Sequence, residues 1–391
     1  MTKTTWHLAF AAGIGLALTA TAGSADVIKV GVVAPFSGPF AVYGQEFRGA
    51  IDTWVAQHGK MAGSHEVQFI FKDSGGPNPA AAKSATQELL IRDGVKYLAG
   101  YVFTPNALAA APLASKAHVP TVIWNAATSI ITTKSPEFIR TSFTLPQAAM
   151  PMADWAIAHG IKSVVIAVSD YGPGIDADKA FAKEFTAKGG TILDEIRMPV
   201  NTTDFSPFMQ RIKSKAPNAL FSFIPAGPPA FSFVKSYSDY GLKAAGIKFL
   251  GTGDLVDETE LQGIGDAGIG VITAHHYSVA HDSAANKAFL AAFQKAAPNV
   301  TPNFAAVGAY DGMRVLYKMI EAGGTDGAKA LKSVIGTSWE SPRGPVTIDP
   351  RTRSLTQNMY IREVVKGADG KLENKEIDTI KDVPDLGLVS K

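Results

Sequence analysis

The sequence contains no cysteine, so the chain forms no disulfide and has no thiol that could carry a lipid anchor. It also has no excess of charge of one sign, because 37 Lys plus Arg residues face 35 Asp plus Glu residues, a formal net charge of +2. The basic residues do not cluster among aromatic ones. We therefore expect no nucleic acid partner, since such partners need a basic surface.

Long hydrophobic runs are scarce, and the one that stands out lies near the N-terminus. It covers residues 8–18, follows Lys3 and precedes a stretch of small residues, but it is too short to span a bilayer. This is the pattern of a secretory signal peptide. We predict a signal peptide over residues 1–25, cleaved after Ala25 or alternatively after Ala22, and a mature periplasmic protein without a membrane anchor. A retained anchor is the other interpretation.

From Asp26 onward, strand and helix patterns alternate in a chain whose 391 residues suit about two domains. The β-rich runs predict strands at 30–34, 66–72, 96–100, 119–124, 163–168, 191–196, 219–223 and 248–251. Between them, apolar residues at helical spacing predict helices around 47–55, 79–92, 107–116, 177–185, 205–215 and 230–240. Repeated βαβ units indicate an α/β fold with two doubly wound parallel-sheet lobes.

The C-terminal third continues this pattern with two helices, at 286–297 and 305–322. Two late strands, 342–350 and 357–365, are too few for a third domain, so we expect them to complete the two sheets already begun. This requires the chain to cross between the lobes more than once. Residues 317–327 and 367–371 are predicted as surface turns.

Motifs for cofactors and catalysis are weak. Gly263, Gly265 and Gly268 have dinucleotide-fingerprint spacing, but a helical segment precedes them and a strand follows, the reverse of what that motif needs. His275 and His276 would face opposite ways in a strand and could not chelate one metal. We find no nucleophile elbow and no set of acid, base and nucleophile. We therefore expect no enzyme activity, no metal and no cofactor.

Loops that carry hydroxyl or aromatic side chains recur where strands end. Residues 36–43, 103–106 and 125–129 follow strands of the first lobe, and residues 170–174 follow the first strand of the second. Singly, Thr104 and Thr128 fit ordinary N-caps. Together at one edge of a sheet they predict a pocket of neutral donors at helix N-termini, which favours a carboxylate.

The chain resembles the type I periplasmic solute-binding proteins of ABC importers, in the branch of the leucine/isoleucine/valine-binding proteins. The likeness covers Asp26 to Lys391, and three motifs carry it: VVAPFSGP at 32–39 with Tyr43-Gly44, NAAT at 125–128 and DYG at 170–172. It implies two lobes joined by a three-strand hinge, with the ligand trapped between them. The first lobe would hold residues 26–145 plus 280–350, and the second residues 146–279 plus 351–391.

The resemblance also implies roles for single residues. Tyr43 would line the pocket, and the hydroxyl groups of Thr104 and Thr128 would donate to a ligand carboxylate. The backbone of Ala126 would contact the same carboxylate. Tyr171 would close over the ligand from the second lobe. Partners would be a small carboxylate and a membrane permease, and we expect a monomer.

Departures from the family pattern point to a different ligand. The acidic residue that holds the ammonium group of amino acids falls here on Gly253, with Asp254 one position on, and a pocket tyrosine falls within 225–227. The disulfide positions of some relatives fall on Gly75 and Phe103. An unpaired ammonium in a dry cleft would cost several kcal/mol. The sequence therefore predicts a carboxylate without an amine.

A flat slot for an aromatic ring is the remaining feature of the predicted site, and an aromatic acid is the predicted ligand. The predicted ligand-binding residues are Tyr43, Phe103, Thr104, Ala126, Ala127, Thr128, Tyr171, Gly227, Asp254 and His276. Three alternatives stay open: a branched-chain or other amino acid as ligand, a ligand-sensing receptor module of the same fold, and a secreted hydrolase on an α/β scaffold.

Overall fold

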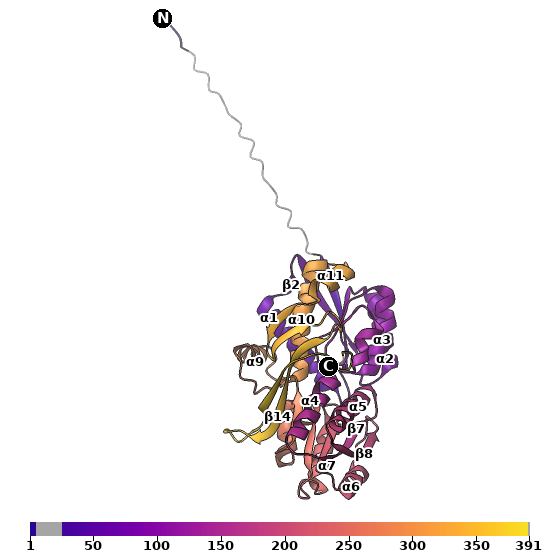
Figure 1. Ribbon diagram of the computed structural model, residues 1–391. Helices are drawn as coiled ribbons and strands as arrows, with labels where there is room; N and C mark the ends of the chain where they lie inside the picture. The colour runs from indigo at the N-terminus through magenta and orange to yellow at the C-terminus, as the bar shows by residue number, and fades with distance from the viewer. Residues whose placement is uncertain (5–25, 390–391) are drawn as a thin grey trace.

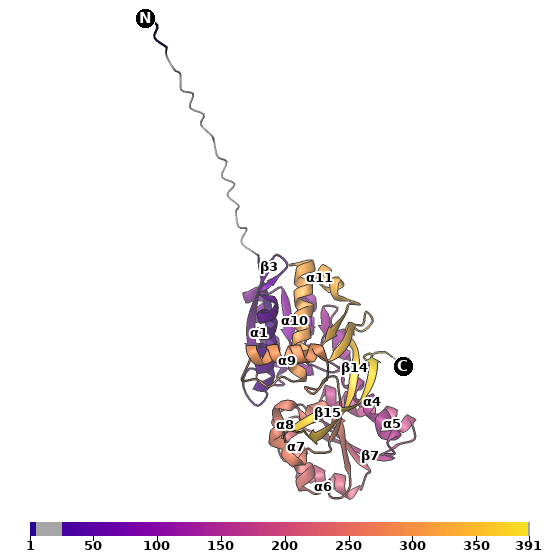
Figure 2. The same cartoon turned by 90° about the vertical axis from the view of Figure 1, so that its left-hand side faces the viewer.

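The computed structural model describes residues 1–4 and 26–389, and residues 26–389 form two lobes, one above the other in Figures 1 and 2. The predicted cleavage after Ala25, and most of the predicted signal peptide, lie outside the described residues. The predicted α/β class with two parallel-sheet lobes is confirmed.

The first lobe is built on a six-stranded sheet of order β2-β3-β1-β4-β5-β6. All neighbouring strands in it are parallel except the short β2, which runs antiparallel to β3. The strands are β1 (Val27–Ala34), β2 (Met61–Ala62), β3 (His65–Asp73), β4 (Tyr97–Gly100), β5 (Thr121–Ile123) and β6 (Phe138–Arg140). The helices between them are α1 (Ala41–His58), α2 (Pro79–Glu88) with a π-turn over Leu89–Asp93, and α3 (Thr104–Ala117).

Helices cover both faces of this sheet because alternate strand residues point to opposite sides. In β1, Val30 and Val32 pack into the core shared with α1, whereas Val33 packs with Leu89 and Ala107 on the other face. Three later helices return to this lobe, where α9 and α10 lie beside α1 (Figure 2). They are α9 (Ala284–Ala296), α10 (Phe304–Gly323) and α11 (Gly327–Val334).

The second lobe holds a nine-stranded sheet of order β12-β13-β14-β11-β10-β9-β7-β8, with β15 also paired to β14. Strands β7 to β11 are parallel where they pair, and the later strands are antiparallel. The parallel strands are β7 (Ser163–Ser169), β8 (Thr191–Met198), β9 (Ala219–Phe223), β10 (Lys248–Thr252) and β11 (Ile272–His275). The helices are α4 (Leu145–Ala158), α5 (Gly172–Ala187), α6 (Ser206–Ser214), α7 (Pro228–Asp239) and α8 (Glu258–Ile264).

The prediction that the late strands would be shared between the two sheets is wrong. All four join the second sheet: β12 (Ser338–Ser341), β13 (Gly344–Ile348), β14 (Leu355–Lys366) and β15 (Leu372–Val383). They follow one another as antiparallel neighbours, which short connections favour, and β14 attaches the group to β11. Within the range 280–350 assigned to the first lobe, β12 and β13 therefore belong to the second sheet.

The predicted surface turn at 317–327 is also wrong in its first half. Helix α10 continues to Gly323, and Tyr317 is 7% exposed, with its hydroxyl donating to Gly59 O at 2.9 Å. The turn predicted at 367–371 does connect β14 and β15.

A buried arginine, Arg343, binds several of the segments that connect the two lobes. The guanidinium of Arg343, in the β12–β13 turn, donates from Nη2 to Asp311 Oδ2 of α10 at 2.6 Å and to Thr141 O at 2.8 Å. Its Nη1 donates to Gln357 Oε1 of β14 at 3.0 Å. Arg343 and Asp311 are almost fully buried. The chain passes between the lobes after β6, after β11 and after α11, and this ion pair holds segments from both sides.

Candidate ligand-binding site

A small closed cavity lies between the lobes, where the strands of both sheets end. Its volume is about 10 Å³, whereas ligand sites usually measure about 300–1,000 Å³, so the cavity in this form is too small for a small-molecule ligand. Both lobes and the passage between them contribute to its lining: Tyr43, Val102, Phe103, Asn125, Ala127, Phe143, Tyr171, Pro173, Phe223, Pro225 and Asp254. Five predicted residues are among them: Tyr43, Phe103, Ala127, Tyr171 and Asp254.

Aromatic rings form the two walls of this cavity. On the first lobe, the Phe103 ring meets the Tyr43 ring edge-to-face with centroids 6.2 Å apart. On the second lobe, Tyr171 and Phe223 stack with centroids 6.0 Å apart. Aromatic side chains from both lobes suit a flat aromatic guest, since aromatic pairs contribute about 0.5–1.5 kcal/mol beyond area burial.

Thr104 and Thr128 lie together, beside this cavity. Their Oγ1 atoms are 2.9 Å apart, and both residues are buried. The first residue of α5, Gly172, covers them from the second lobe, because a Cβ built there would lie 2.9 Å from Thr128 Oγ1. The two hydroxyl groups therefore face the N-terminus of α5, directly after Tyr171. They do not line the cavity itself.

The predicted backbone role of Ala126 meets a competing arrangement. Its N–H donates to Tyr101 O at 3.0 Å and its C=O accepts from Arg140 Nη1 at 3.2 Å, so both backbone groups are paired within the first lobe. Arg140 also donates to the carbonyls of Thr128 and Ser129. Burial lowers the pKa of Arg140, opposed by the charges of Asp385 and Asp176. Arg140 therefore holds the NAAT loop and the residue after it by hydrogen bonds to their backbone carbonyls.

Asp254 is the acidic group of the cavity lining. It is 4% exposed, its Oδ2 accepts from Thr252 Oγ1 at 3.0 Å, and His275 Nε2 lies 3.6 Å from the same oxygen. Burial, and then the charge of Asp254, raises the pKa of Tyr43 well above its usual value, and the same two causes raise the pKa of Tyr171. Both phenols are therefore neutral and able to donate hydrogen bonds.

Gly253 has no room for the acidic side chain that amino-acid binders carry at the matching position. A Cβ built at Gly253 would lie 2.2 Å from Arg362 Nη2 and 2.4 Å from His275 Cγ. Arg362 is buried, and its Nη1 donates to Tyr277 O at 2.6 Å. The Arg362 guanidinium therefore lies directly beside Gly253, and its positive charge disfavours a bound ammonium there.

His276 and Gly227 lie outside the cavity lining. The prediction that His275 and His276 face opposite ways is wrong: their rings lie 4.5 Å apart, and both pack against Phe143 and Phe304. Strand β11 ends at His275, so the alternation of a strand does not extend to His276. Gly227 lies directly before α7 in the second lobe, and a Cβ built there would lie 3.6 Å from the Phe40 ring.

Sequence reasoning missed several residues of the lining, including Phe143 and Phe223. Phe223 is the last residue of β9, so the rule that located the other loops would also have found it. Phe143 lies in the passage after β6, where no periodic pattern marks its direction. Its ring meets both histidines at 4.7 Å, a contact made only by folding.

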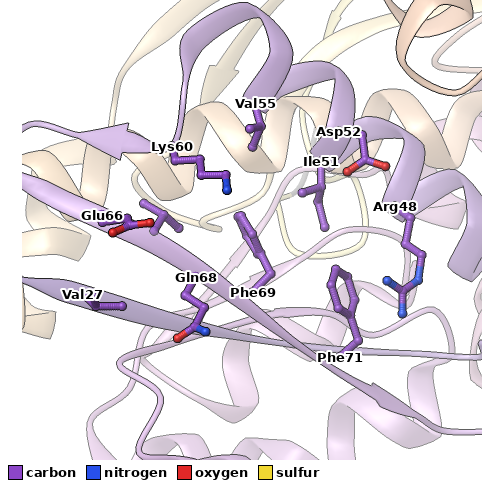
Figure 3. A pocket seen from close by; sticks show the side chains of 11 residues that line it. Val27, Arg48, Ile51, Asp52, Val55, Lys60, Glu66, Gln68, Phe69 and Phe71 are labelled. Carbon is purple, nitrogen blue, oxygen red and sulfur yellow. The ribbon is translucent and has the colours of Figure 1, made fainter.

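A separate hollow of about 540 Å³ lies on the outer side of the first lobe, between α1 and β3 (Figure 3). Arg48, Phe69 and Phe71 line it, and the Arg48 guanidinium carbon lies 3.8 Å from the centre of the Phe71 ring. None of the predicted site residues and no residue of the second lobe belongs to its lining. It is therefore not the interlobe site.

Among the described residues, no three His, Asp or Glu side chains are grouped so that they could hold a metal ion. No helix of the described part has the length and apolar character needed to cross a membrane.

Two doubly wound lobes that enclose one site define a bilobal ligand-binding protein. Residues 27–371 match the family described as periplasmic binding protein, and the chain belongs to this family. The resemblance to type I solute-binding proteins is thereby confirmed.

Known relatives cover nearly the whole chain. The Leu/Ile/Val-binding protein homolog 6 of Brucella abortus (strain 2308) is 50% identical over 95% of this chain and 96% of its own length. A solute-binding protein of an ABC transporter from R. palustris, solved with 4-hydroxybenzoate, is 54% identical with a TM-score of 0.91, over 94% of this chain and all of that one. One from Rhodopseudomonas palustris BisB5, solved with 3,4-dihydroxybenzoic acid, is 44% identical with a TM-score of 0.89, over 93% of this chain and all of that one.

Proposed function

We propose that the protein is the extracytoplasmic substrate-binding component of an ABC importer and that it captures an aromatic carboxylate. One observation carries the proposal: aromatic side chains from both lobes line the cavity, Tyr43 and Phe103 from the first and Tyr171 and Phe223 from the second. The similar structures with 4-hydroxybenzoate and 3,4-dihydroxybenzoic acid support it. Export through cleavage near Ala25 and action as a monomer in the periplasm belong to the same proposal.

The ligand carboxylate would lie between the first lobe and the N-terminus of α5. Thr104 and Thr128 donate their hydroxyl hydrogens to the carboxylate in place of their mutual bond. The first turn of α5 adds a partial positive charge, which favours an anion without a buried countercharge. The ring then stacks between Phe103 and the pair of Tyr171 and Phe223.

Transport follows from a shift of population between open and closed forms. The ligand contacts both lobes only when they close, so its binding free energy favours the closed form. The permease then recognises the closed shape. For the lobes we propose the predicted division, with β12 and β13 moved to the second.

An amino acid is the second candidate, because Asp254 faces the cavity and could pair with an ammonium group. Calorimetric titration with 4-hydroxybenzoate and with leucine separates the two. We expect binding of the aromatic acid and a far weaker response to leucine. Tight leucine binding without a response to aromatic acids would reverse the assignment. Mass spectrometry of the small molecule that co-purifies with the protein gives an independent answer.

A further inference from the structure

We propose that Asp254 selects aromatic acids that carry a hydroxyl group on the ring opposite the carboxylate, by accepting a hydrogen bond from that hydroxyl. The inference rests on the proposed function and adds the residue that reads the far end of the ligand. It commits the site to 4-hydroxylated aromatic acids in preference to the unsubstituted acid.

The carboxylate of Asp254 is placed and oriented for this contact. It lines the cavity, is 4% exposed, and lies in the short 3-10 turn Gly253–Val256 that follows β10. Thr252 Oγ1 donates to Oδ2 at 3.0 Å. Among the described residues no hydrogen bond is made to Oδ1, so this oxygen remains for a ligand.

The sheet of the second lobe sets the distance between the two ends of the site. Tyr171 and Gly172 follow β7, Asp254 follows β10, and β9 lies between these two strands. All three strands are parallel, so their carboxyl ends lie at one edge. Two strand spacings separate the loops by about 10 Å. This suits one benzene ring with a hydrogen-bonding group at each end, whereas an amino acid carries both groups on one carbon.

The surroundings of Asp254 favour a phenol over an ammonium. Arg362 Nη2 stands behind Gly253, and its positive charge opposes a second cation. His275 lies 3.6 Å from Asp254, but burial lowers the pKa of His275, so the imidazole adds no positive charge beside Asp254 near pH 7. A neutral O–H donor satisfies this carboxylate without adding charge.

The same reasoning predicts rejection of the unsubstituted acid. When the lobes close on benzoate, the ring C–H would face Asp254 and the carboxylate would lose water without gaining a donor. A buried polar group left unpaired carries its full desolvation cost, which is why sites built to bind a hydroxyl strongly reject the analogue without it.

The test is isothermal titration calorimetry with 4-hydroxybenzoate and benzoate, on the wild type, Asp254→Asn and Asp254→Ser. We expect the wild type to bind 4-hydroxybenzoate at least about 10-fold more tightly than benzoate. Asp254→Asn should bind 4-hydroxybenzoate about 10-fold more weakly and benzoate as well as the wild type or better. The control is Asp266→Asn, an exposed aspartate of the same lobe, which should leave both affinities unchanged.

Each outcome bears on one claim. Retained benzoate binding shows that an Asp254 variant is folded. If Asp254→Asn does not fold, Asp254→Ser provides a second variant that also removes the carboxylate. A contrary outcome is that both aromatic acids bind the wild type while the Asp254 variants lower the two affinities equally or change neither. In that case the proposed role of Asp254 is wrong and the proposed function stands. If no aromatic acid binds the wild type, the proposed function itself fails.

Discussion

At the scale of single residues, the site depends on small side chains that come together at strand ends. Thr104 begins α3 and Thr128 ends the NAAT turn, and neither position is unusual for a threonine. What gives them a shared role is their 2.9 Å contact beneath Gly172. Two neutral hydroxyl groups can then release each other and donate to one anion.

Replacing either threonine by valine should therefore weaken ligand binding. A hydrogen bond to a charged group contributes about 1.5–3 kcal/mol, so Thr104→Val and Thr128→Val should each reduce affinity for 4-hydroxybenzoate about 10- to 100-fold. Calorimetric titration measures the loss. Thr133→Val, on the exposed side of the turn that follows Thr128, is the matched control and should change nothing. Unaltered affinity in both site variants would exclude a hydroxyl grip on the carboxylate.

The sequence allowed about half of the cavity lining to be predicted, and the reason is geometric. Tyr43, Phe103 and Tyr171 lie in loops directly after strands, and parallel strands bring such loops to one edge. Phe143 and Arg140 lie at a passage between lobes, where direction depends on distant partners. Asp254 was found only as a neighbour of Gly253, and the space taken by Arg362 explains why the acidic group is displaced.

At the scale of elements, most strands and helices of the alternating region lie where periodicity predicts them, since each buries an apolar face. Strand β9 begins and ends as predicted, at Ala219 and Phe223. The two late strands predicted at 342–350 and 357–365 are present as β13 and β14, and only their division between the two sheets was predicted wrongly. Sheet membership there is decided by pairing between segments far apart in the sequence.

Three elements meet around a buried pair of carboxyl groups. Glu46 of α1 is fully buried and neither of its oxygens has a hydrogen-bond partner among the described residues, and Asp257 at the start of α8 is 1% exposed. Asn303, at the start of α10, donates from Nδ2 to Asp257 Oδ2 at 2.9 Å. Burial, with the charge of Glu258, raises the pKa of Asp257 to about 7. Burial, and then the charge of Asp257, raises the pKa of Glu46 well above its usual value.

This pair should make closure depend on pH. Because the pKa values are raised in the packed state, its stabilisation is fully present only below the ordinary carboxyl pKa near 4 and is lost as pH rises through about 7. Ligand affinity should therefore fall as pH rises from about 5.5 to about 7 and level off above that, while the ligand carboxylate stays ionised. Titrations from about pH 5.5 to 8 test it. Asp257→Asn should flatten the profile, and an equally steep profile in that variant would assign the effect to other groups.

The ion pair between Arg343 and Asp311 should dominate the stability of the passages between the lobes. Arg343→Met leaves a buried carboxylate without its cation, which costs about 3–5 kcal/mol. Lys287→Met removes an exposed ion pair with Asp282 and should cost at most about 1 kcal/mol. Thermal unfolding followed by circular dichroism compares the two. Similar melting temperatures for both variants would show that the buried pair is dispensable.

At the scale of the whole molecule, two rigid sheets meet across a site that is nearly filled by their own side chains. The cavity of about 10 Å³ is too small for an aromatic acid, so the proposed function requires binding to begin on an open form. Closure then depends on how closely the second lobe approaches the threonine pair. That approach is limited at Gly172, where a Cβ would lie 2.9 Å from Thr128 Oγ1 and 3.2 Å from Thr104 Cγ2.

Gly172→Ala should consequently hold the lobes apart. Overpacking of a tight contact typically costs about 1–3 kcal/mol. If the whole cost falls on the closed form, ligand affinity should drop roughly 5- to 150-fold. Small-angle X-ray scattering of the wild type should show a smaller radius of gyration once 4-hydroxybenzoate is added, and the variant should stay extended at the same ligand concentration. Gly367→Ala, in the β14–β15 turn where the nearest atom to a new Cβ lies at 3.3 Å, is the control and should close like the wild type. A wild type whose scattering does not change with ligand, or an alanine variant that closes as fully, would mean that recognition does not proceed through closure at this contact.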